Sequence, residues 1–294
     1  MKSTAGFYYV RSNDGNIIEC KARGVFRKQK LTPLVGDKVT VETDGQTGTV
    51  VGIAERKNFL QRPPVANIDK LIVISAVKEP VPNLPIIDKM TAIAVDKNIT
   101  PVVVFSKSDL GETEELVEIY RKAGIESFAV SAKTGEGISE FMDLLRDKLS
   151  AFVGQSGVGK SSLVNVLDDT CVLKTGSLSK KYGRGSHTTT KGTLNRLQLN
   201  TAYTGGIHGE IASIIDTPGI RRFMLHGIEA EDLHLYFREF KPFVGKCKFG
   251  MNCTHTSEPD CAIKQAVESG EISQKRYESW IRIRDQIKTG SWDD

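Results

Sequence analysis

The feature that most constrains the fold of this sequence is a glycine-rich run near its middle, Gly154-Gln155-Ser156-Gly157-Val158-Gly159-Lys160-Ser161. It fits the pattern G-x-x-x-x-G-K-[ST] without a mismatch, and it lies between an apolar segment (151–153) and an amphipathic one (161–167). A strand, a glycine-rich turn and a helix N-terminus in this order let successive backbone N–H groups surround a phosphate. Lys160 can reach the β- and γ-phosphates, Ser161 can bind Mg²⁺, and Ser162 completes the predicted phosphate-binding set. A glycine-rich turn with a capping lysine is the structural alternative, and it leaves these flanking segments unexplained.

Two polar motifs follow predicted strands that precede this loop in the sequence, and they indicate which nucleotide base is bound. They are Ser106-Lys107-Ser108-Asp109, after the apolar run 102–105, and Ser131-Ala132-Lys133, after 128–130. The Asp109 carboxylate can accept hydrogen bonds from guanine N1–H and from the exocyclic amine, which adenine cannot match, while Lys107 can lie along the base plane. The second motif can close over guanine O6. Each motif is weak alone, but together beside a phosphate loop they predict a guanine-nucleotide site.

A fourth motif, Asp216-Thr217-Pro218-Gly219, follows the predicted strand 211–215. Its carboxylate can hold Mg²⁺ through water, and the Gly219 amide can meet a γ-phosphate. The motifs run S-K-S-D, S-A-K, P-loop and D-T-P-G, whereas an ordinary small GTPase runs P-loop, D-T-P-G, N-K-x-D and S-A-K. This order predicts a circular permutation, which a sheet tolerates because ligand groups at strand ends depend on sheet position rather than on chain order. The segment after Gly219, which senses the γ-phosphate, then leads directly into the C-terminal part.

The sequence pattern changes twice along the chain and predicts three domains. Residues 1–64 read as short strands separated by Asn-Asp-Gly and Asp-Gly turns, which predicts a small barrel, OB-like or SH3-like. Residues 65–222 alternate apolar runs with helical patterns, which predicts a mostly parallel sheet with helices on both faces. The expected strands are 71–77, 102–105, 128–130, 151–153 and 211–215, and the expected helices are 84–98, 112–123, 137–148 and 160–168. Residues 223–294 carry two expected helices, 231–240 and 274–288.

Positive charge is concentrated in the first domain. The 294 residues carry a net charge of +4, and residues 1–62 hold eleven Lys and Arg against six Asp and Glu. The remainder is close to balance. A basic barrel suits an anionic partner, nucleic acid in particular. On charge alone, a chance excess on a solvated surface explains the pattern equally well.

Three of the five cysteines crowd into the C-terminal part, together with a histidine: Cys247, Cys253, His255 and Cys261. Three thiolates and one imidazole without a carboxylate suit tetrahedral Zn²⁺, and four protein ligands leave no open catalytic position. The spacing is not that of a C-x2-C finger, so four buried or free side chains remain an alternative. We predict one structural Zn²⁺ per chain, with Cys20 and Cys171 as ordinary core thiols.

These motifs together closely resemble the circularly permuted, ribosome small-subunit-dependent GTPases, a family of bacterial late-assembly factors. The resemblance covers essentially the whole chain. It implies an α/β fold: a circularly permuted P-loop GTPase domain with an N-terminal OB-like β-barrel and a C-terminal helical zinc module. It further implies GTP hydrolysis to GDP and phosphate stimulated by the 30S subunit, with 16S rRNA as a contact. One departure is Ser106, where Asn or Thr is usual; Ser loses an amide donor, so reduced base affinity is expected while Asp109 keeps guanine specificity.

Hydrolysis needs a group that orients water, and the usual Gln after D-x-x-G is replaced by Ile220. The glycine-rich polar stretch 183–190 falls where switch I belongs. We expect one of Thr188, Thr189 and Thr190 to bind Mg²⁺ beside Ser161 and Asp216, with Thr189 as the working assignment. His187 can orient or deprotonate water near neutral pH, and the family resemblance supports this role. The alternative is that His187 only binds phosphate or rRNA from a basic loop.

The sequence also bears on localisation and on the alternative functions. No apolar run approaches the ~20 residues that span a bilayer, and the first six residues do not open a signal peptide, so we expect a cytoplasmic protein with no membrane partner. We expect a monomer. Two other functions are weighed: a P-loop ATPase or kinase, which makes Asp109 and Lys133 coincidental, and an RNA-binding protein with a vestigial nucleotide site. The intact Lys160, Ser161 and Asp216 argue against the second.

Overall fold

A computed structural model of the chain describes residues 2–4, 7–24, 26, 31–44, 47–61, 64–168, 193–204, 209, 211–216, 225 and 227–291. The chain divides into two compact units. One comprises residues 1–70, 138–153 and 161–220, and the other comprises residues 71–137, 154–160 and 221–294. The phosphate-binding loop and the C-terminal cysteines therefore belong to the same unit.

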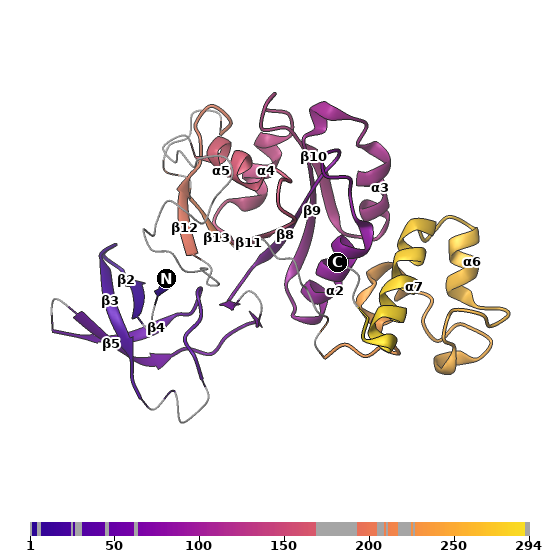
Figure 1. Ribbon diagram of the computed structural model, residues 1–294, viewed down its shortest axis with the longest axis horizontal. Helices are drawn as coiled ribbons and strands as arrows, with labels where there is room; N and C mark the ends of the chain where they lie inside the picture. The colour runs from indigo at the N-terminus through magenta and orange to yellow at the C-terminus, as the bar shows by residue number, and fades with distance from the viewer. Residues whose placement is uncertain are drawn as a thin grey trace. The chain divides into compact units, whose positions relative to one another are not determined.

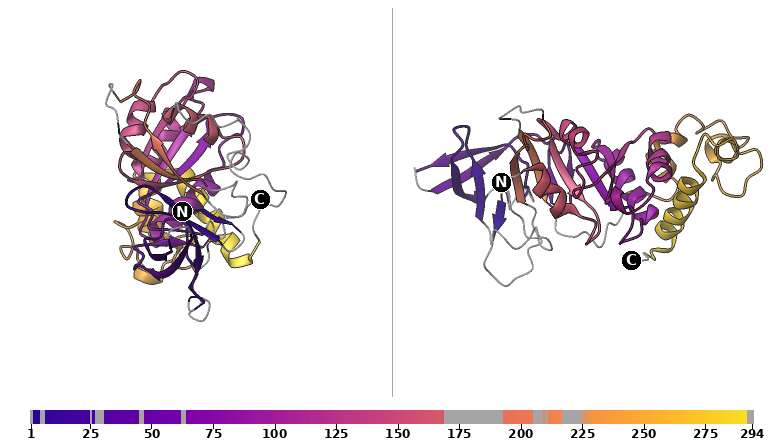
Figure 2. Two further views of the ribbon diagram at one scale, coloured as in Figure 1. Left: turned by 90° about the vertical axis from the view of Figure 1, so that its left-hand side faces the viewer. Right: turned by 90° about the horizontal axis from the view of Figure 1, so that it is seen from above.

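The N-terminal strands of the first unit form the predicted barrel, drawn in indigo in Figure 2. They are β1 (Lys2–Thr4), β2 (Phe7–Arg11), β3 (Ile17–Ala22), β4 (Val39–Thr43) and β5 (Thr47–Ile53). Their order is β1-β2-β3-β5-β4, and β3 runs parallel to β5 while the other neighbours are antiparallel. A meander of hairpins cannot make this parallel pair, so the order is the Greek-key order of an OB-like barrel. Alternate strand residues close its core, namely Tyr8, Val10, Cys20 and Val50, together with Phe26.

The other strands of this unit carry part of the α/β sheet. They are β11 (Leu149–Val153), β12 (Thr193–Gln198) and β13 (Ile211–Asp216), in the order β11-β13-β12. β11 runs parallel to β13, and β12 is antiparallel to it. Two short strands, β6 (Phe59–Leu60) and β7 (Val65–Ala66), form a separate pair. Helices α4 (Ile138–Leu145) and α5 (Lys160–Leu167) complete the unit, with Phe141 of α4 5.8 Å from Phe152 of β11 between ring centroids.

The second unit holds the strands that end in the predicted base-recognition motifs. They are β8 (Lys70–Ala76), β9 (Thr100–Ser106) and β10 (Glu126–Val130), in the order β10-β9-β8. β9 and β10 are parallel, so both motifs leave the sheet at the same edge. Helix α2 (Leu84–Asp96) packs on β9, and α3 (Glu114–Lys122) packs on both β9 and β10. The side chain of Asn83 starts α2 by accepting a hydrogen bond from the Ile86 amide, 3.2 Å away.

The C-terminal part of this unit is built from short turns and two helices, η2 (Leu233–Tyr236), η3 (Arg238–Phe240), η4 (Gly250–Asn252), α6 (Ala262–Glu268) and α7 (Gln274–Thr289). We call residues 227–291 the C-terminal module. Figure 1 shows α7 alongside α2. The predicted helix 231–240 was wrong as a continuous element, because Phe237 has extended angles (φ −95°, ψ 100°) and divides it into two 3₁₀ turns.

The predicted α/β elements are present with boundaries that differ by a few residues, and the mixed α/β class is confirmed. β12 was not predicted from the sequence. Among the interior residues of this strand Leu197 is buried. The sequence therefore shows little of the alternation between apolar and polar residues that predicts a strand. Within the described residues, no helix combines the length and the apolar character needed to cross a membrane.

Candidate functional site

The phosphate-binding loop adopts a positive-φ backbone that favours glycine at three positions. Gly154, Gly157 and Gly159 have φ of 156°, 83° and 90°. At Gly154 the constraint is also steric, because a Cβ there would lie 2.2 Å from the carbonyl oxygen of Ile74 in β8. Ser156 at the tip is exposed, and α5 begins at Lys160. The predicted strand, loop and helix are thus formed, with the N-terminal end of α5 directly after the loop.

The Lys160 side chain is held over the loop. Its Nζ donates to the carbonyl oxygens of Gly154 and Gln155, at 2.7 and 2.6 Å. These bonds fix an ammonium group next to the backbone amides, and Ser161 and Ser162 follow in the first turn of α5. A fixed positive charge at a helix N-terminus is suited to phosphate oxygens.

The two base-recognition motifs meet at the edge where β9 and β10 end. Asp109 lies in η1 (Ser108–Leu110), and its Oδ1 accepts a hydrogen bond from Ser131 Oγ at 2.7 Å. Ala132 follows, and Lys133 Nζ lies 3.7 Å from Asp109 Oδ2. The Ser131 hydrogen bond, with the Lys133 charge as a smaller contribution, lowers the pKa of Asp109. The carboxylate is therefore ionised at neutral pH and acts only as an acceptor, as recognition of guanine N1–H requires.

A second layer of contacts fixes these motifs. The fully buried Ser131 accepts hydrogen bonds from the amides of Lys133 and Thr134 through its Oγ, each at 3.2 Å. Ser108 Oγ donates to Glu136 Oε2 at 2.6 Å, and the Glu136 carbonyl accepts from the Ser131 amide at 3.0 Å. Glu136 was not predicted, and its acidic side chain in a polar loop carried no distinguishing sequence signal.

Lys107 is held by a backbone carbonyl that the sequence could not reveal. It has a left-handed backbone (φ 59°), and its Nζ donates to the Glu79 carbonyl oxygen at 2.5 Å. The next residue, Pro80, has its Cδ 4.0 Å from where a Cβ on Gly157 would lie. The Lys107 stem therefore runs from the base-recognition motif toward the tip of the phosphate loop.

Ser106, the departure from the usual motif, joins the same two parts. It is buried, and its Oγ lies 2.5 Å from the Val158 carbonyl oxygen in the phosphate loop and 3.2 Å from that of Ser75 at the end of β8. A hydroxyl has one proton, and the shorter distance assigns it to Val158. Ser106 thus retains a link between the base-recognition motif and the phosphate loop; the expected reduction in base affinity stays a prediction.

We expect Ser106→Ala to lower GTP affinity about tenfold, because the buried Val158 carbonyl loses its donor and the loop loses its tether. Calorimetric titration with GTP and GDP measures this directly. Ser106→Thr keeps the hydroxyl and serves as the control. Wild-type affinity in the alanine variant would assign the hydroxyl no part in binding.

The predicted Mg²⁺ ligands are described only in part. Ser161 lies in the first turn of α5, and Asp216 is the last residue of β13, where its backbone pairs with Phe152. The side chain of Asp216 lies outside the described part of the structure, as do His187, the residues 188–190 and Gly219. The predicted roles of these groups stay predictions.

The four predicted metal ligands come together in the C-terminal module. The ligand atoms of Cys247, Cys253, His255 and Cys261 all lie within 4.8 Å of one another, and all four residues are buried. Cys247 Sγ lies 3.8 Å from Cys261 Sγ, and His255 Nδ1 lies 3.4 and 3.5 Å from these two sulfurs. With Zn–S bonds of about 2.3 Å, a tetrahedral site has S–S edges of about 3.8 Å. The donor set and its spacing therefore fit one tetrahedral metal ion.

The surroundings set the protonation states and positions of these groups. Burial lowers the pKa of His255 to about 4, so its ring is neutral and Nδ1 is free to coordinate. Burial raises the pKa of Cys253 to about 12 in the absence of a cation, so metal binding must displace protons from the thiols. Tyr277 Oη donates to the His255 carbonyl oxygen at 2.8 Å, and the Ala262 amide donates to Cys247 Sγ at 3.3 Å.

One contributor to this centre was missed from the sequence. The Glu258 carboxylate accepts hydrogen bonds from the amides of Thr254 and Thr256, at 2.8 and 3.1 Å. A hydrogen bond from the Thr254 side chain, together with those from the backbone amides, lowers the pKa of Glu258 to about 2. The sequence showed only an acidic residue between the predicted metal ligands. Such a residue suggests a further metal ligand as readily as an acceptor of backbone hydrogen bonds in the loop.

Comparison with known proteins gives two family matches. The RsgA GTPase family model matches residues 53–226, and the model of the RsgA N-terminal domain matches residues 1–51. The chain is 43% identical over 292 residues to the small ribosomal subunit biogenesis GTPase RsgA of Caldanaerobacter subterraneus, covering 98% of this chain and 94% of that protein. It is 40% identical to the protein of the same name from a Geobacillus species, covering 98% and 96%.

Two solved structures have the same fold. A crystal structure of YloQ, described as a circularly permuted GTPase, is 31% identical with a TM-score of 0.75 and covers 100% of this chain and 95% of that one. The crystal structure of YjeQ from Thermotoga maritima is 34% identical with a TM-score of 0.76, covering 97% and 95%. The predicted circular permutation of the GTPase fold is therefore confirmed.

Proposed function

The chain belongs to the RsgA GTPase family and is a GTP-hydrolysing enzyme of small ribosomal subunit biogenesis, and from this premise we propose that the 30S particle itself stimulates its hydrolysis of GTP. The substrates are GTP and water, and the products are GDP and phosphate. The protein acts as a monomer in the cytoplasm and touches 16S rRNA on the particle.

The observation that carries the nucleotide part of this proposal is the joining of base and phosphate recognition in one unit. Asp109 is held ionised by Ser131, and Ser106 ties the same motif to Val158 of the phosphate loop. A guanine that engages Asp109 is thereby placed at a fixed distance from Lys160. This arrangement favours GTP over ATP, because adenine offers no pair of donors to a carboxylate.

Contact with 16S rRNA is supported by the charge of the barrel. Arg11, Lys21 and Arg23 lie on or just after β2 and β3 and are exposed, within a segment that holds eleven basic and six acidic residues. Binding through such groups releases counterions from the RNA and weakens steeply with salt. The barrel thus supplies affinity for the particle, while the base-recognition motifs and the phosphate loop of the second unit bind the nucleotide.

For hydrolysis, the family's chemistry uses Mg²⁺, which neutralises charge on the β- and γ-phosphates. Ser161, Asp216 and Thr189, or a neighbour of Thr189 in 188–190, would hold the ion. We assign orientation of the attacking water to His187, because Ile220 cannot perform it. Zn²⁺ is the metal we assign to the Cys3His cluster, where it supports the fold and takes no part in hydrolysis.

The test of this function is phosphate release by the purified protein with GTP or ATP, with and without 30S particles, across a salt series. We expect release from GTP only, strong stimulation by 30S, and a stimulation that falls with salt. The triple variant Arg11→Glu/Lys21→Glu/Arg23→Glu should keep nucleotide affinity and lose most of the stimulation.

Lys122→Glu, an exposed charge reversal at the end of α3, is the matched control for surface charge and should behave as wild type. Equal rates with ATP and GTP would contradict the nucleotide assignment. Full stimulation in the triple variant at every salt concentration would remove the barrel from the contact with the particle.

We expect His187→Ala to bind GTP normally and to lower turnover on 30S particles by about 10²-fold, the usual scale for loss of a general base or water-orienting group. Single-turnover hydrolysis at saturating GTP separates this from weaker binding. Thr189→Ala should instead reduce Mg²⁺-dependent affinity, so the two variants have different signatures. Wild-type turnover of the His187→Ala variant would exclude His187 from the mechanism.

A further inference from the structure

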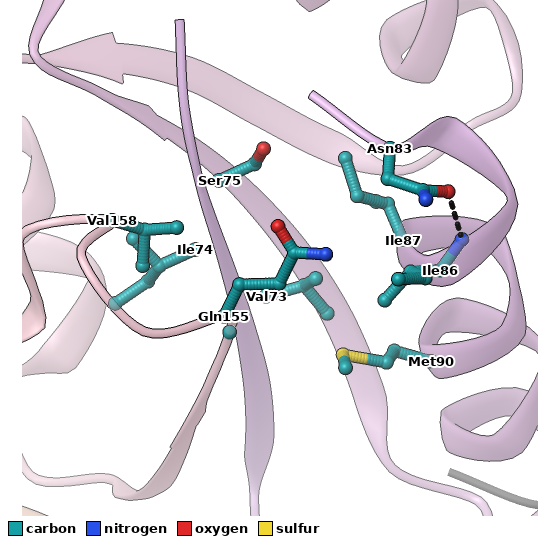
Figure 3. Close-up of a pocket in the computed structure, with 10 residues that line it drawn as sticks. Val73, Ile74, Ser75, Asn83, Ile86, Ile87, Met90, Gln155 and Val158 are labelled. Atoms are coloured by element: carbon teal, nitrogen blue, oxygen red, sulfur yellow. Dashed lines mark hydrogen bonds between the residues drawn. The ribbon is translucent and has the colours of Figure 1, made fainter. Parts of the chain in front are cut away.

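Helix α2 lines a small pocket together with the phosphate-binding loop. Ile86, Ile87 and Met90 line this pocket with Gln155 and Val158, and Figure 3 shows the Gln155 side chain across from the side chains of α2. The cavity is small, about 10 Å³, which is room for about one water molecule. Side chains packed this closely must move when the loop changes shape, so a shift of the loop displaces this face of α2.

Through another face, α2 holds the C-terminal module by a buried ion pair. Arg276 of α7 donates from Nη1 to Asp88 Oδ1 at 2.5 Å, and from Nε and Nη2 to the two carboxylate oxygens of Glu239 at 2.7 and 3.1 Å. The side chains are 2%, 0% and 4% exposed. The guanidinium carbon lies 4.4 Å from the centroid of the Phe237 ring, so the cation is also held from the aromatic side.

The two carboxylates have different positions in the fold. Glu239 belongs to η3 inside the C-terminal module, whereas Asp88 belongs to α2. Burial raises the pKa of Asp88 despite the attraction of Arg276, and the two carboxylates hold the pKa of Arg276 above its ordinary value against the effect of burial. One cation thus serves two buried carboxylates.

Other polar contacts between the module and the sheet-covering helices are weaker. Lys275 Nζ lies 2.6 Å from Glu115 Oε1 of α3, but both side chains are largely exposed (47% and 76%). Arg238 Nη1 donates to the Gly124 carbonyl oxygen at 3.3 Å, also at the surface. Exposed pairs are screened and contribute little, whereas a buried hydrogen-bonded pair with one geometry transmits a displacement of either element to the other.

From this arrangement we infer that α2 carries the nucleotide state of the phosphate loop to the C-terminal module, with Asp88–Arg276 as the contact that transmits it. Arg276 is in this respect a positioning residue: it sets where α7 lies when α2 moves. The inference rests on the proposed nucleotide binding and not on the ribosomal particle. Its experiment can therefore fail without contradicting the proposed 30S contact.

Trp280 reports on this contact without a foreign label. It lies on α7 one turn after Arg276, is 1% exposed, and packs against Phe240 with ring centroids 5.5 Å apart. The other tryptophan, Trp292, is removed by Trp292→Phe in every protein compared. Trp280 is then the one tryptophan of the chain.

The experiment compares Trp280 emission of the full-length, zinc-loaded protein saturated with GDP and with a non-hydrolysable GTP analogue plus Mg²⁺. We expect the two emissions to differ in wild type. Asp88→Asn should abolish most of that difference while nucleotide affinity stays within about threefold, because Glu239 still pairs with Arg276 and keeps the module folded. Glu115→Gln in α3 removes the exposed pair with Lys275, the neighbour of Arg276 on α7, and is the matched control; it should keep the full difference.

If Asp88→Asn melts well below wild type, Arg276→Lys replaces it in the same measurement, since it keeps the charge and loses the forked geometry. Hydrogen exchange of the α7 amides in the two nucleotide states provides the second measurement. Equal emission and equal exchange with the two nucleotides in wild type would overturn the inference, as would an undiminished difference in the folded Asp88 or Arg276 variant.

Discussion

Asp109→Asn should weaken GTP binding by about 10³-fold, because one hydrogen bond to an ionised acceptor, worth roughly 1.5–3 kcal/mol, gives way to a donor facing a donor, and the other bond loses its ionised acceptor. The wild-type carboxylate is oriented by Ser131 and held ionised at neutral pH, so both of its oxygens are acceptors. An asparagine amide keeps one acceptor and presents two N–H donors instead. One of the two guanine donors, N1–H or the exocyclic amine, then faces a donor.

The same substitution should strengthen the binding of xanthosine triphosphate. Xanthine has a carbonyl oxygen where guanine has the exocyclic amine, and this oxygen repels the Asp109 carboxylate but can accept from an amide. The variant is therefore expected to exchange one base preference for the other rather than lose nucleotide binding altogether. That exchange distinguishes loss of base recognition from collapse of the loop.

Competition titrations with GTP, ATP and xanthosine triphosphate measure the switch. Ser108→Ala serves as control, because it alters the same 3₁₀ turn and its bond to Glu136 without touching the base acceptor. We expect the control to retain its preference for GTP. Equal affinity of the wild-type protein for ATP and GTP, or an unchanged GTP affinity in the asparagine variant, would contradict the assignment of Asp109.

The parts of the site that sequence reasoning found are those set by local chain geometry. Gly154, Asp109 and Ser131 follow the ends of strands within a few residues, and Lys160 begins the helix after the loop; in each place a short motif fixes both backbone and side-chain direction. The cysteine cluster was found for a similar reason, since its four ligands lie within fifteen consecutive residues. Periodicity predicted the buried strands because β8, β9 and β11 are continuous apolar runs.

The parts that could not be predicted depend on contacts between distant segments. Lys107 uses the carbonyl of Glu79, 28 residues away, and a backbone oxygen leaves no signature in the sequence. Asp88 and Arg276 are 188 residues apart, and each read as an ordinary charged residue of an amphipathic helix. The sequence suggested that the C-terminal module is connected to the nucleotide site through the segment after Gly219. The buried Asp88–Arg276 pair provides a second connection, through α2, and no motif spacing in the sequence indicates it.

Cys253→Ser should reduce zinc affinity by about 10³-fold, since four ligands share a binding free energy of roughly 10–16 kcal/mol and one thiolate is removed. The effect extends beyond the metal, because the ligand loop and the helical core are one packed structure. His255 lies 6.3 Å from Trp280 between ring centroids, and Tyr277 of α7 bonds to the His255 backbone. We therefore expect lower thermal stability and a weaker near-ultraviolet signal from Trp280.

Metal analysis and calorimetry of protein purified without chelator test this, with one zinc per chain expected for wild type and substoichiometric zinc for the variant. Cys20→Ser is the matched control, because Cys20 is equally buried but lies in the barrel core with Tyr8 and Val50. It should retain one zinc and the full Trp280 signal, so general thiol loss and barrel destabilisation are separated from ligand loss. Absence of zinc from the wild-type protein, or one tightly bound zinc in the Cys253 variant, would contradict a structural Cys3His site. The physical reason to expect neither is that four buried ligand atoms within 4.8 Å of one another match the size and donor set of a tetrahedral zinc site.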